Sequence, residues 1–380
     1  MRTVMVTKFV PLPADSGGKR RSLALLTRLA ALGPTILCAF DDGTADLEGI
    51  ARLGAETRTV RWDPSARRVI SGLRRTGSVS AARFWDERLR RQVLAAASTP
   101  TDLLQVEYTQ LAPYAEGITA RTRVLDLHNV ESALVRSMAG IRSRPVRIAL
   151  ELEAKRLRRL EQAALPRFDA IAVVSDTDRA RLQSEGARIL VCPNGWDAAE
   201  PIPLGEEKAV IFVGLLGWEP NVDAAVWLAK EVWPGVRERV PDAKLLLVGR
   251  DPSRRVLDLR SETIEVAGSV PDVRPYLARA RVATAPLRAA GGSRLKILEA
   301  LAAGRPVVAT STGAEGLTDL LGSGIVVADS VPATVDALVA LLHDRQQARA
   351  LGRAGHEAVR DRYSWDTTLR PLFDFLGKGR

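Results

Sequence analysis

Short apolar runs alternate with amphipathic stretches along almost the whole chain. In the first half, runs rich in leucine and β-branched residues predict strands at 3–8, 35–40, 102–107, 123–128, 169–175 and 188–193. In the second half, the same kind of run predicts strands at 209–214, 244–249, 263–268, 281–286, 306–310 and 324–328. Stretches with the helical spacing of apolar residues separate most of these runs. Apolar strands that alternate with helices are typical of parallel sheets covered on both faces.

A linker interrupts this pattern near the middle of the chain. Residues 194–208 are rich in proline, glycine and charged residues, which is the composition of a connecting segment. We therefore expect two doubly wound α/β domains, an N-terminal domain over 1–200 and a C-terminal domain over 201–361. Ligands of open α/β sheets bind beyond the carboxyl ends of the strands, so the cleft between the two domains is the expected site.

The composition is that of a globular protein with sizeable cores. The chain has 380 residues, of which 46% are hydrophobic and 26% are charged. The N-terminal apolar segment is too short for a secretory signal, and no apolar run has the length of a membrane-spanning helix. Cys38 and Cys192 lie in apolar runs without disulfide or metal spacing. These features predict a cytoplasmic protein with buried free thiols.

The formal net charge is +10, and much of it is arginine in segments 67–92 and 147–162. Two interpretations of these segments stay open. They are either solvated helix faces or a patch that contacts the inner face of an anionic membrane. Neither zinc-finger spacing nor a ribonucleoprotein-type aromatic motif is present, so we predict no nucleic-acid partner.

Several common catalytic and cofactor motifs are missing. No G-x-G-x-x-G follows a predicted strand, segment 16–22 departs from the P-loop pattern, and no G-x-S-x-G elbow occurs. The three histidines, His128, His343 and His356, have no metal-ligand spacing, and the acidic segment 41–46 is interpreted as a solvated turn. We therefore predict neither a bound metal nor a cofactor.

Three glycine-bearing loops follow predicted strands and begin predicted helices. Two loops span 13–22 and 213–221, and the third opens the stretch 291–308. Their candidate contact residues are Gly17, Gly18, Gly214, Gly217, Gly291, Gly292 and the expected cap Ser293. Glycine permits close approach of the backbone to a ligand, and the N-terminus of a helix favours an anion. Any one of these loops alone is well explained as a turn. Three of them together predict a diphosphate site.

The helix that follows the third loop carries two cations at its start. Arg294 and Lys296 are each disfavoured by roughly 0.3–1 kcal/mol at the positive end of a helix, unless an anion binds there. Glu299 shares a helix face with the apolar Leu295 and Ala302, so we expect it to point inward. It either binds the hydroxyls of a ribose or pairs with Lys296, and the spacing leaves both interpretations open.

The stretch 285–317, "APLRAAGGSRLKILEALAAGRPVVATSTGAEGL", resembles glycosyltransferase family 4. Further similar segments cover nearly the whole chain, at 13–33, 124–132, 170–182, 191–197, 212–228, 245–252 and 270–282. The resemblance implies the GT-B fold, in which two Rossmann-like domains face each other across a cleft. It also implies that a C-terminal helix within 362–380 completes the N-terminal domain.

The resemblance further implies that a sugar is transferred from a nucleotide diphosphate sugar to an acceptor hydroxyl, with retention and without a divalent metal. Arg294 and Lys296 would then stabilise the leaving diphosphate. Glu299 would bind the ribose, and His128 would lie beside the donor sugar. The remaining residues implied for donor binding are the glycines named above, Ser293, Leu295, Arg250 and the backbone around Val270.

The acceptor implied by the resemblance is either a lipid-linked saccharide or a small metabolite. Glu107 and Gln110, at the end of a predicted strand, either line the acceptor cleft or belong to a surface loop. The sequence also departs from the family, because Gly291 occupies the place of the usual first Glu of the motif, so the donor sugar stays open. Two other functions remain as alternatives, a nucleotide-sugar epimerase and a basic, non-catalytic binder of anionic surfaces or nucleic acid.

Overall fold

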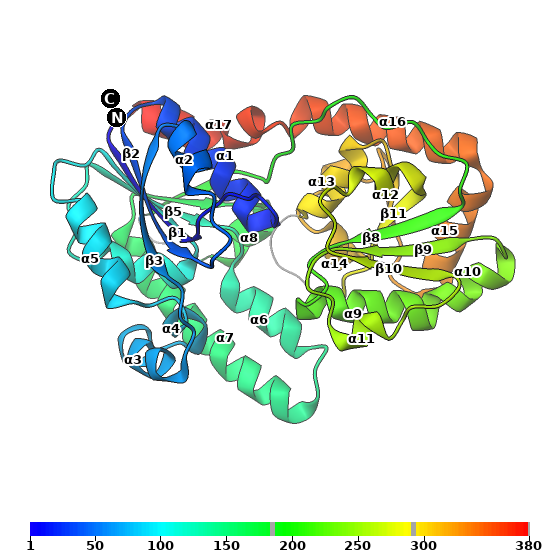
Figure 1. Cartoon of the computed structure of the whole chain (residues 1–380), viewed down its shortest axis with the longest axis horizontal. Helices are drawn as coiled ribbons and strands as arrows, with labels where there is room; N and C mark the ends of the chain where they lie inside the picture. The colour runs from blue at the N-terminus through cyan, green and yellow to red at the C-terminus, as the bar shows by residue number, and fades with distance from the viewer. Residues whose placement is uncertain (183–186, 290–293, 379–380) are drawn as a thin grey trace. The chain divides into compact units, whose positions relative to one another are not determined.

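The computed structural model describes residues 1–182, 187–289 and 294–378 and shows two compact units (Figure 1). Unit 1 comprises Met1–Pro193 together with Leu369–Arg380, and unit 2 comprises Asn194–Thr368. The divisions expected from the sequence lie after residues 200 and 361. Each unit is built on its own parallel sheet.

The sheet of unit 1 has seven strands in the order β3-β2-β1-β4-β5-β6-β7. The strands are β1 Thr3–Phe9, β2 Thr35–Asp41, β3 Ala55–Arg61, β4 Leu103–Glu107, β5 Thr122–Leu127, β6 Ala170–Val173 and β7 Arg188–Val191, all in parallel pairs. Six of them were predicted, and β3 was missed. It is an edge strand with charged residues among its seven, so it lacks the apolar run by which the buried strands were recognised.

The sheet of unit 2 has six strands in the order β10-β9-β8-β11-β12-β13, and all six were predicted. They are β8 Ala209–Val213, β9 Lys244–Val248, β10 Ile264–Gly268, β11 Ala280–Ala285, β12 Val307–Ala309 and β13 Ile325–Val327. Both sheets share one connectivity. The first strand of each sheet, β1 or β8, lies between the second and the fourth strand of that unit. Loops that leave these two central strands diverge, and the crevice so formed is where such sheets bind ligands.

Helices cover both faces of each sheet. In unit 1 they are α1 Gly17–Ala31, α2 Leu47–Arg52, α3 Ala66–Thr76, α4 Val79–Ala82, α5 Glu87–Ala96, α6 Glu131–Ala139, α7 Arg144–Ala164 and α8 Asp176–Arg181, with the 3-10 turns η1 Thr109–Ala115 and η2 Leu165–Arg167. In unit 2 they are α9 Glu219–Trp227, η3 Leu228–Val232, α10 Trp233–Arg239, α11 Arg254–Leu257, α12 Arg274–Arg279, α13 Leu295–Ala302, α14 Ser311–Ala314, η4 Thr318–Leu320, α15 Val331–His343 and α16 Arg345–Arg362. Figure 1 shows α13 and α16 on one side of the second sheet and α9 and α10 on the other.

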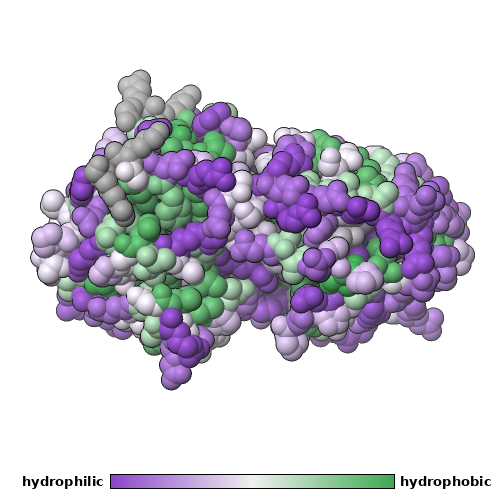
Figure 2. Space-filling view, turned by 90° about the horizontal axis from the view of Figure 1, so that it is seen from above, coloured by the Kyte–Doolittle hydropathy of each residue, from purple (hydrophilic) through white to green (hydrophobic). Residues whose placement is uncertain are grey.

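The core of each unit lies between its sheet and the covering helices. Val4, Val6 and Leu104 are fully buried in unit 1, as are Phe212 and Leu245 in unit 2. Burial of each such side chain contributes roughly 1.5–3 kcal/mol. The surface seen in Figure 2 is mostly hydrophilic around smaller apolar areas, as is usual for a protein in water.

The last helix, α17 Trp365–Lys378, begins in unit 2 and ends in unit 1. Leu369, Leu372 and Leu376 of α17 are buried. Cys38 and Cys192 are buried free thiols, as the sequence predicted. None of the helices in the described part of the chain combines the length and the apolar character needed to cross a bilayer.

Candidate active site

Two glycines at the carboxyl ends of β8 and β9 pack against each other in unit 2. Gly249 has a φ of +148°, and a Cβ atom there would lie 1.6 Å from the carbonyl oxygen of Gly214. A Cβ atom on Gly214 would in turn lie 3.0 Å from the Nζ atom of Lys296. Glycine at position 249 is therefore required by close packing, and Gly214 leaves room for the side-chain ends of Asn221 and Lys296. The structure brings the predicted Gly214 and Lys296 together at the ligand-binding crevice of this unit.

Lys296 lies half-buried on the first turn of α13. Its Nζ atom donates a hydrogen bond to Oδ1 of Asn221 at 2.6 Å and lies 4.5 Å from the centre of the Phe212 ring. Burial and, to a smaller extent, the charge of Arg294 lower the pKa of Lys296 to about 7, against the opposing charge of Glu299. A bound anion would favour the protonated form and raise this pKa.

Asn221 is a site residue that sequence reasoning missed. It lies on α9, and its Nδ2 atom donates to the carbonyl oxygen of Leu215 at 3.0 Å while its Oδ1 atom accepts from Lys296. Asn221 therefore ties the loop after β8 to the start of α13. The only signal in the sequence was its place at the end of the glycine-bearing loop 213–221.

The start of α13 has no anionic side chain of its own. Arg294 occupies the N-cap position without a capping hydrogen bond from its side chain, and no acidic residue lies in the first turn. The guanidinium of Arg294 donates to the carbonyl oxygen of Thr312 at 3.1 Å. The side chain of Leu295 is buried, so Leu295 offers a ligand only its backbone N–H, which has no partner within the helix. These features fit an anion-binding helix start.

The other predicted donor residues lie at the same edge of this sheet or outside the described residues. Arg250 follows β9, and its carbonyl oxygen accepts a hydrogen bond from the N–H of Leu216 at 2.8 Å. Val270 follows β10 and is half-buried. Glu299 is half-buried on α13, three residues after Lys296. Gly291, Gly292 and Ser293 lie outside the described residues.

The corresponding crevice of unit 1 is filled by a tyrosine. Gly18 is the second residue of α1, and a Cβ atom there would lie 2.2 Å from the hydroxyl oxygen of Tyr108 and 3.6 Å from Nδ1 of His128. The absence of a side chain at Gly18 thus makes room for Tyr108. This contact gives Gly18 a structural reason of its own, and the donor role of Gly17 and Gly18 stays a prediction.

His128 lies directly after β5 and contacts a buried carboxylate. Its Nε2 atom is 3.0 Å from Oε2 of Glu107, and its ring centre is 3.9 Å from that of Tyr108. Burial lowers the pKa of His128 to about 3, against the opposing charge of Asp126, so the ring is neutral at physiological pH. Burial also raises the pKa of Glu107 to about 7, although a hydrogen bond from Ser22 and the charge of Arg21 oppose this rise.

A buried ion pair lies beneath this histidine. Arg21 donates to both carboxylate oxygens of Asp126, from Nε and from a terminal nitrogen, each at 2.8 Å. Both side chains are essentially inaccessible to solvent. A further terminal nitrogen of Arg21 donates to the carbonyl oxygen of Cys192 at 2.9 Å. The pair therefore joins the start of α1, the end of β5 and the end of β7 into one rigid corner.

Among the described residues, one group of side chains lies close enough together to hold a metal ion, namely Glu107, Asp126 and His128. Both oxygens of Asp126 already bind Arg21, and a guanidinium at this distance repels a second cation. The donor set thus fits a structural network better than a metal site. The absence of a metal stays a prediction.

Glu107 and Gln110 do not line an open surface. Glu107 is fully buried and Gln110 is 4% exposed. The chain reverses at Tyr108, whose φ is +68°, and continues into the buried turn η1. This reversal directs both side chains inward, so the interpretation of Glu107 and Gln110 as part of a surface loop is wrong, and their role as acceptor contacts stays a prediction. The reversal is a tertiary feature that the alternation of apolar and polar residues does not reveal.

Residues 207–344 match the family described as "Glycosyl transferases group 1". The match lies within unit 2. The matched segment contains Gly214, Asn221, Lys296 and Glu299, all at the crevice of unit 2 or on its helix α13. The family predicted from the sequence is therefore confirmed.

Curated relatives agree with this family. A GDP-mannose-dependent alpha-(1-6)-phosphatidylinositol monomannoside mannosyltransferase from Mycobacterium tuberculosis is 35% identical, over 55% of this chain and 61% of the relative. A trehalose synthase from Rubrobacter xylanophilus is 31% identical over 37% of each protein. The match thus spans about three fifths of the mannosyltransferase.

Solved structures confirm the predicted GT-B fold of two Rossmann-like domains. A sucrose-phosphate synthase from Thermosynechococcus elongatus has a TM-score of 0.73 at 18% identity, over 100% of this chain and 98% of that protein. The Anabaena protein Alr3699/HepE, in complex with UDP and glucose, has a TM-score of 0.66 at 13% identity, over 99% of both chains. At these identities the likeness concerns the fold.

Proposed function

We propose that this protein is a glycosyltransferase that transfers a sugar from a nucleotide diphosphate sugar to an acceptor hydroxyl, with retention and without a metal. The observation that carries the proposal is the ammonium group of Lys296 at the start of α13, beside Gly214. A cation, the N-terminus of a helix and a backbone that can approach the ligand closely together stabilise the negative charge that develops on a leaving diphosphate. Arg294 adds a second positive charge at the same helix start.

The donor proposed is GDP-mannose, because the first curated relatives are named as GDP-mannose-dependent mannosyltransferases. Glu299 binds the hydroxyls of the nucleotide ribose. The contact between His128 and the donor sugar stays an expectation of the family resemblance.

The acceptor proposed is a lipid-linked saccharide, since those relatives are named for a phosphatidylinositol monomannoside acceptor. Peripheral contact with the inner face of a membrane would bring the enzyme to such a substrate. Helix α7 supports this contact, because Val146, Ile148 and Leu152 are exposed among arginines on one amphipathic helix. Vesicle flotation of the chain and of the double variant Ile148→Glu and Leu152→Glu tests it, and equal flotation of both would contradict it.

Donor binding is tested by calorimetry and thermal unfolding with GDP, GDP-mannose, UDP-glucose and UDP-N-acetylglucosamine in the presence of EDTA. We expect one guanine nucleotide sugar to stabilise the protein, by roughly 2.7 kcal/mol at a hundred times its dissociation constant. We also expect slow hydrolysis of the donor without an acceptor. Lys296→Met should abolish the stabilisation, whereas Lys230→Met, which removes an exposed lysine of the same unit, should leave it intact.

The products of the same incubation separate this function from its alternative. An epimerase would release a nucleotide sugar with one inverted ring carbon, whereas a transferase releases the free nucleotide diphosphate. Absence of binding by every nucleotide tested, with a folded protein, would contradict the proposed function.

A further inference from the structure

A bidentate ion pair joins helix α9 to the segment that follows β11. The carboxylate of Asp223 accepts a hydrogen bond from Nε of Arg288 at 3.0 Å and another from a terminal nitrogen of the same guanidinium at 2.6 Å. The side chain of Asp223 is 10% exposed, and the guanidinium lies 6.0 Å from the ring centre of Trp227. Two parallel hydrogen bonds fix the direction of the Arg288 side chain as well as its distance from α9.

The same helix holds Lys296 through a second side chain. Asn221, two residues before Asp223, accepts a hydrogen bond from Lys296 at 2.6 Å and donates one to the carbonyl oxygen of Leu215 at 3.0 Å. Helices α9 and α13 lie on opposite sides of the second sheet (Figure 1), so Asn221 and Lys296 meet at the carboxyl edge of that sheet. Helix α9 thus contacts the chain at Arg288, before the start of α13, and again at Lys296, on its first turn.

The backbone around Arg288 is fixed by the core of unit 2. Leu287 and Ala289, on either side of Arg288, are buried. The hydroxyl group of Thr310 donates to the carbonyl oxygen of Leu287. Strand β11, which ends just before this segment at Ala285, pairs with the central strand β8. Arg288 therefore projects from a rigid part of the sheet edge and is a fixed point to which α9 is attached.

Apolar contacts alone would leave the position of α9 less closely defined. Val222, Ala224 and Ala225 of this helix are buried in the core of unit 2. The free energy of such burial depends on the area removed from water and has little directional preference. A small rotation or sliding of α9 would move Asn221 with it and would draw Asn221 away from Lys296. A bidentate ion pair opposes this movement because hydrogen bonds weaken steeply when they bend.

We propose that Asp223 and Arg288 are positioning residues for donor binding. The pair fixes α9 against the end of β11, and Asn221 of that helix then holds Lys296 where the diphosphate binds. Neither Asp223 nor Arg288 needs to touch a ligand for this role. The proposal rests on the proposed function and adds two residues that act on the donor through Lys296.

Direct contact between Arg288 and the diphosphate is the competing interpretation, since the Arg288 side chain is 45% exposed. Lysine at this position separates the two interpretations, because it keeps the positive charge but cannot form the two parallel hydrogen bonds of a guanidinium. If Arg288 is a positioning residue, Arg288→Lys should weaken binding of the diphosphate as much as Asp223→Asn does. If Arg288 binds the anion itself, Arg288→Lys should retain most of the affinity, and so should Asp223→Asn, which frees the guanidinium.

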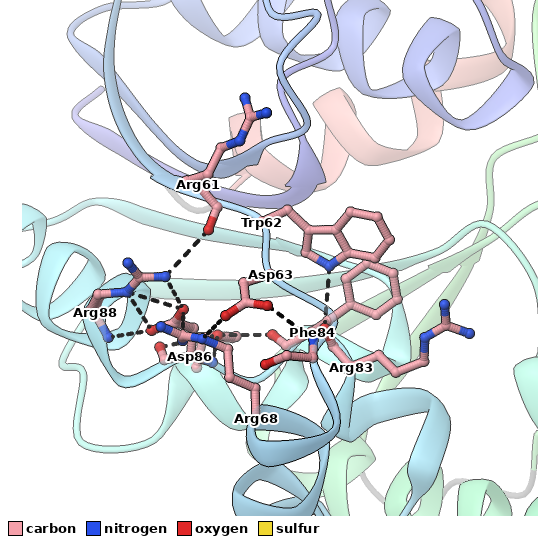
Figure 3. A network of polar contacts seen from close by, with 10 residues as sticks. Arg61, Trp62, Asp63, Arg68, Arg83, Phe84, Asp86 and Arg88 are labelled. Atoms are coloured by element: carbon pink, nitrogen blue, oxygen red, sulfur yellow. Dashed lines mark hydrogen bonds and ion pairs between the residues drawn. The ribbon is translucent and has the colours of Figure 1, made fainter.

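A buried aspartate of unit 1 provides a matched control. The carboxylate of Asp86 accepts hydrogen bonds from Arg68 and Arg88, and its side chain is 4% exposed. Figure 3 shows this network, in which Arg68 also binds Asp63. Asp86→Asn removes the same charge from the same kind of ion pair, but in the unit that does not contain Lys296. It should lower the melting temperature without changing the affinity for a diphosphate.

The test measures binding of inorganic pyrophosphate and of GDP to the full chain by calorimetry, below the melting temperature of every variant. Pyrophosphate reports on the diphosphate site whatever the base and the sugar of the donor are. We expect Asp223→Asn and Arg288→Lys each to weaken pyrophosphate binding about ten-fold. The double variant should bind no more weakly than either single variant, because both changes break one interaction. Asp86→Asn should bind pyrophosphate like the unaltered chain.

Each contrary outcome overturns the proposal for a different reason. Unchanged affinity in Asp223→Asn and in Arg288→Lys, with normal binding by the unaltered chain, would make the pair a structural feature only. Retained affinity in Arg288→Lys together with a loss in Arg288→Gln would assign Arg288 to direct contact with the anion. An equal loss in Asp86→Asn would make the effect one of general destabilisation. Absence of pyrophosphate and GDP binding by the unaltered chain would contradict the proposed function, and this inference with it. Arg288→Lys keeps a counter-charge for Asp223, so the test holds even if Asp223→Asn does not fold.

Discussion

The two units share one strand order, yet they use the crevice at its centre in opposite ways. In unit 1 the crevice is filled by the protein's own groups, with Tyr108 against Gly18 and the ion pair of Arg21 and Asp126 beneath. In unit 2 the crevice presents a half-buried lysine whose hydrogen-bond partner is the neutral amide of Asn221. A buried cation neutralised by a carboxylate is structural, whereas one held only by an amide can still meet an anionic ligand.

This difference explains why a common topology does not imply a common function for the two sheets. The connectivity places both crevices, but the side chains at the strand ends decide which of them can bind a ligand.

The largest expected effect is on the structural pair of unit 1. Arg21→Met leaves the carboxylate of Asp126 buried without a counter-charge, so it should lower the free energy of unfolding by about 3–5 kcal/mol. Urea denaturation measures this loss. Arg353→Met, which breaks an exposed pair with Glu357, should change stability little. An equal loss of unfolding free energy in the two variants would mean that the buried pair of Arg21 and Asp126 stabilises unit 1 no more than an exposed pair does.

Lys296→Met is expected to affect function and to spare stability. Turnover should fall by roughly ten- to a thousand-fold because stabilisation of the leaving diphosphate is lost. The melting temperature without nucleotide should stay unchanged or rise slightly, since a cation at an empty helix start is unfavourable. Arg294→Met should behave similarly. Strong destabilisation without ligand, together with normal turnover of the folded variant, would show that these cations are structural.

Glu299→Gln separates the two interpretations of that carboxylate. If Glu299 binds the ribose, loss of charge-assisted hydrogen bonds should weaken nucleotide binding by roughly 1.5–3 kcal/mol, with the fold retained. Calorimetry with GDP measures the change. An unchanged affinity would instead assign Glu299 to the electrostatic support of Lys296.

Nucleotide affinity should depend on pH through Lys296, whose pKa is about 7 in the free protein. A bound diphosphate raises this pKa. Above pH 7, Lys296 therefore gains a proton when the nucleotide binds, whereas below pH 7 Lys296 is already protonated. Affinity should therefore fall by up to about ten-fold per pH unit as the pH rises above 7. Calorimetry in buffers of different ionisation enthalpy measures the proton uptake. Lys296→Arg should remove the dependence, and its persistence in that variant would assign it to another group.

The smallest expected effect is that of chelation. Activity should survive EDTA, because cations of the protein meet the charge of the leaving group and the carboxylate of Asp126, near His128, is already bound to Arg21. Initial rates with and without EDTA measure this. Loss of activity in EDTA that magnesium or manganese restores would contradict this prediction and the roles that we assign to the two crevices.

The fold was predictable from the sequence to a large extent because it depends on periodicity along single elements. Buried parallel strands such as β1 and β8 appear as continuous apolar runs, and twelve predicted runs correspond to strands. The edge strand β3 was missed because its charged side chains break that signal. Arg294 and Lys296 were recognisable because cations at a helix start are locally unfavourable.

Only the tertiary structure decided which residues far apart in the chain come into contact. Lys296 meets Asn221 across 75 positions, and Arg21 meets Asp126 across 105. Such pairs depend on the order of strands in the sheet, which the alternation of apolar and polar residues does not encode. Tyr108 beside Gly18 and the burial of Glu107 have the same origin. The sequence by itself thus determined the two sheets and the cationic helix start, and the packing of strand ends decided which crevice stays available to a ligand.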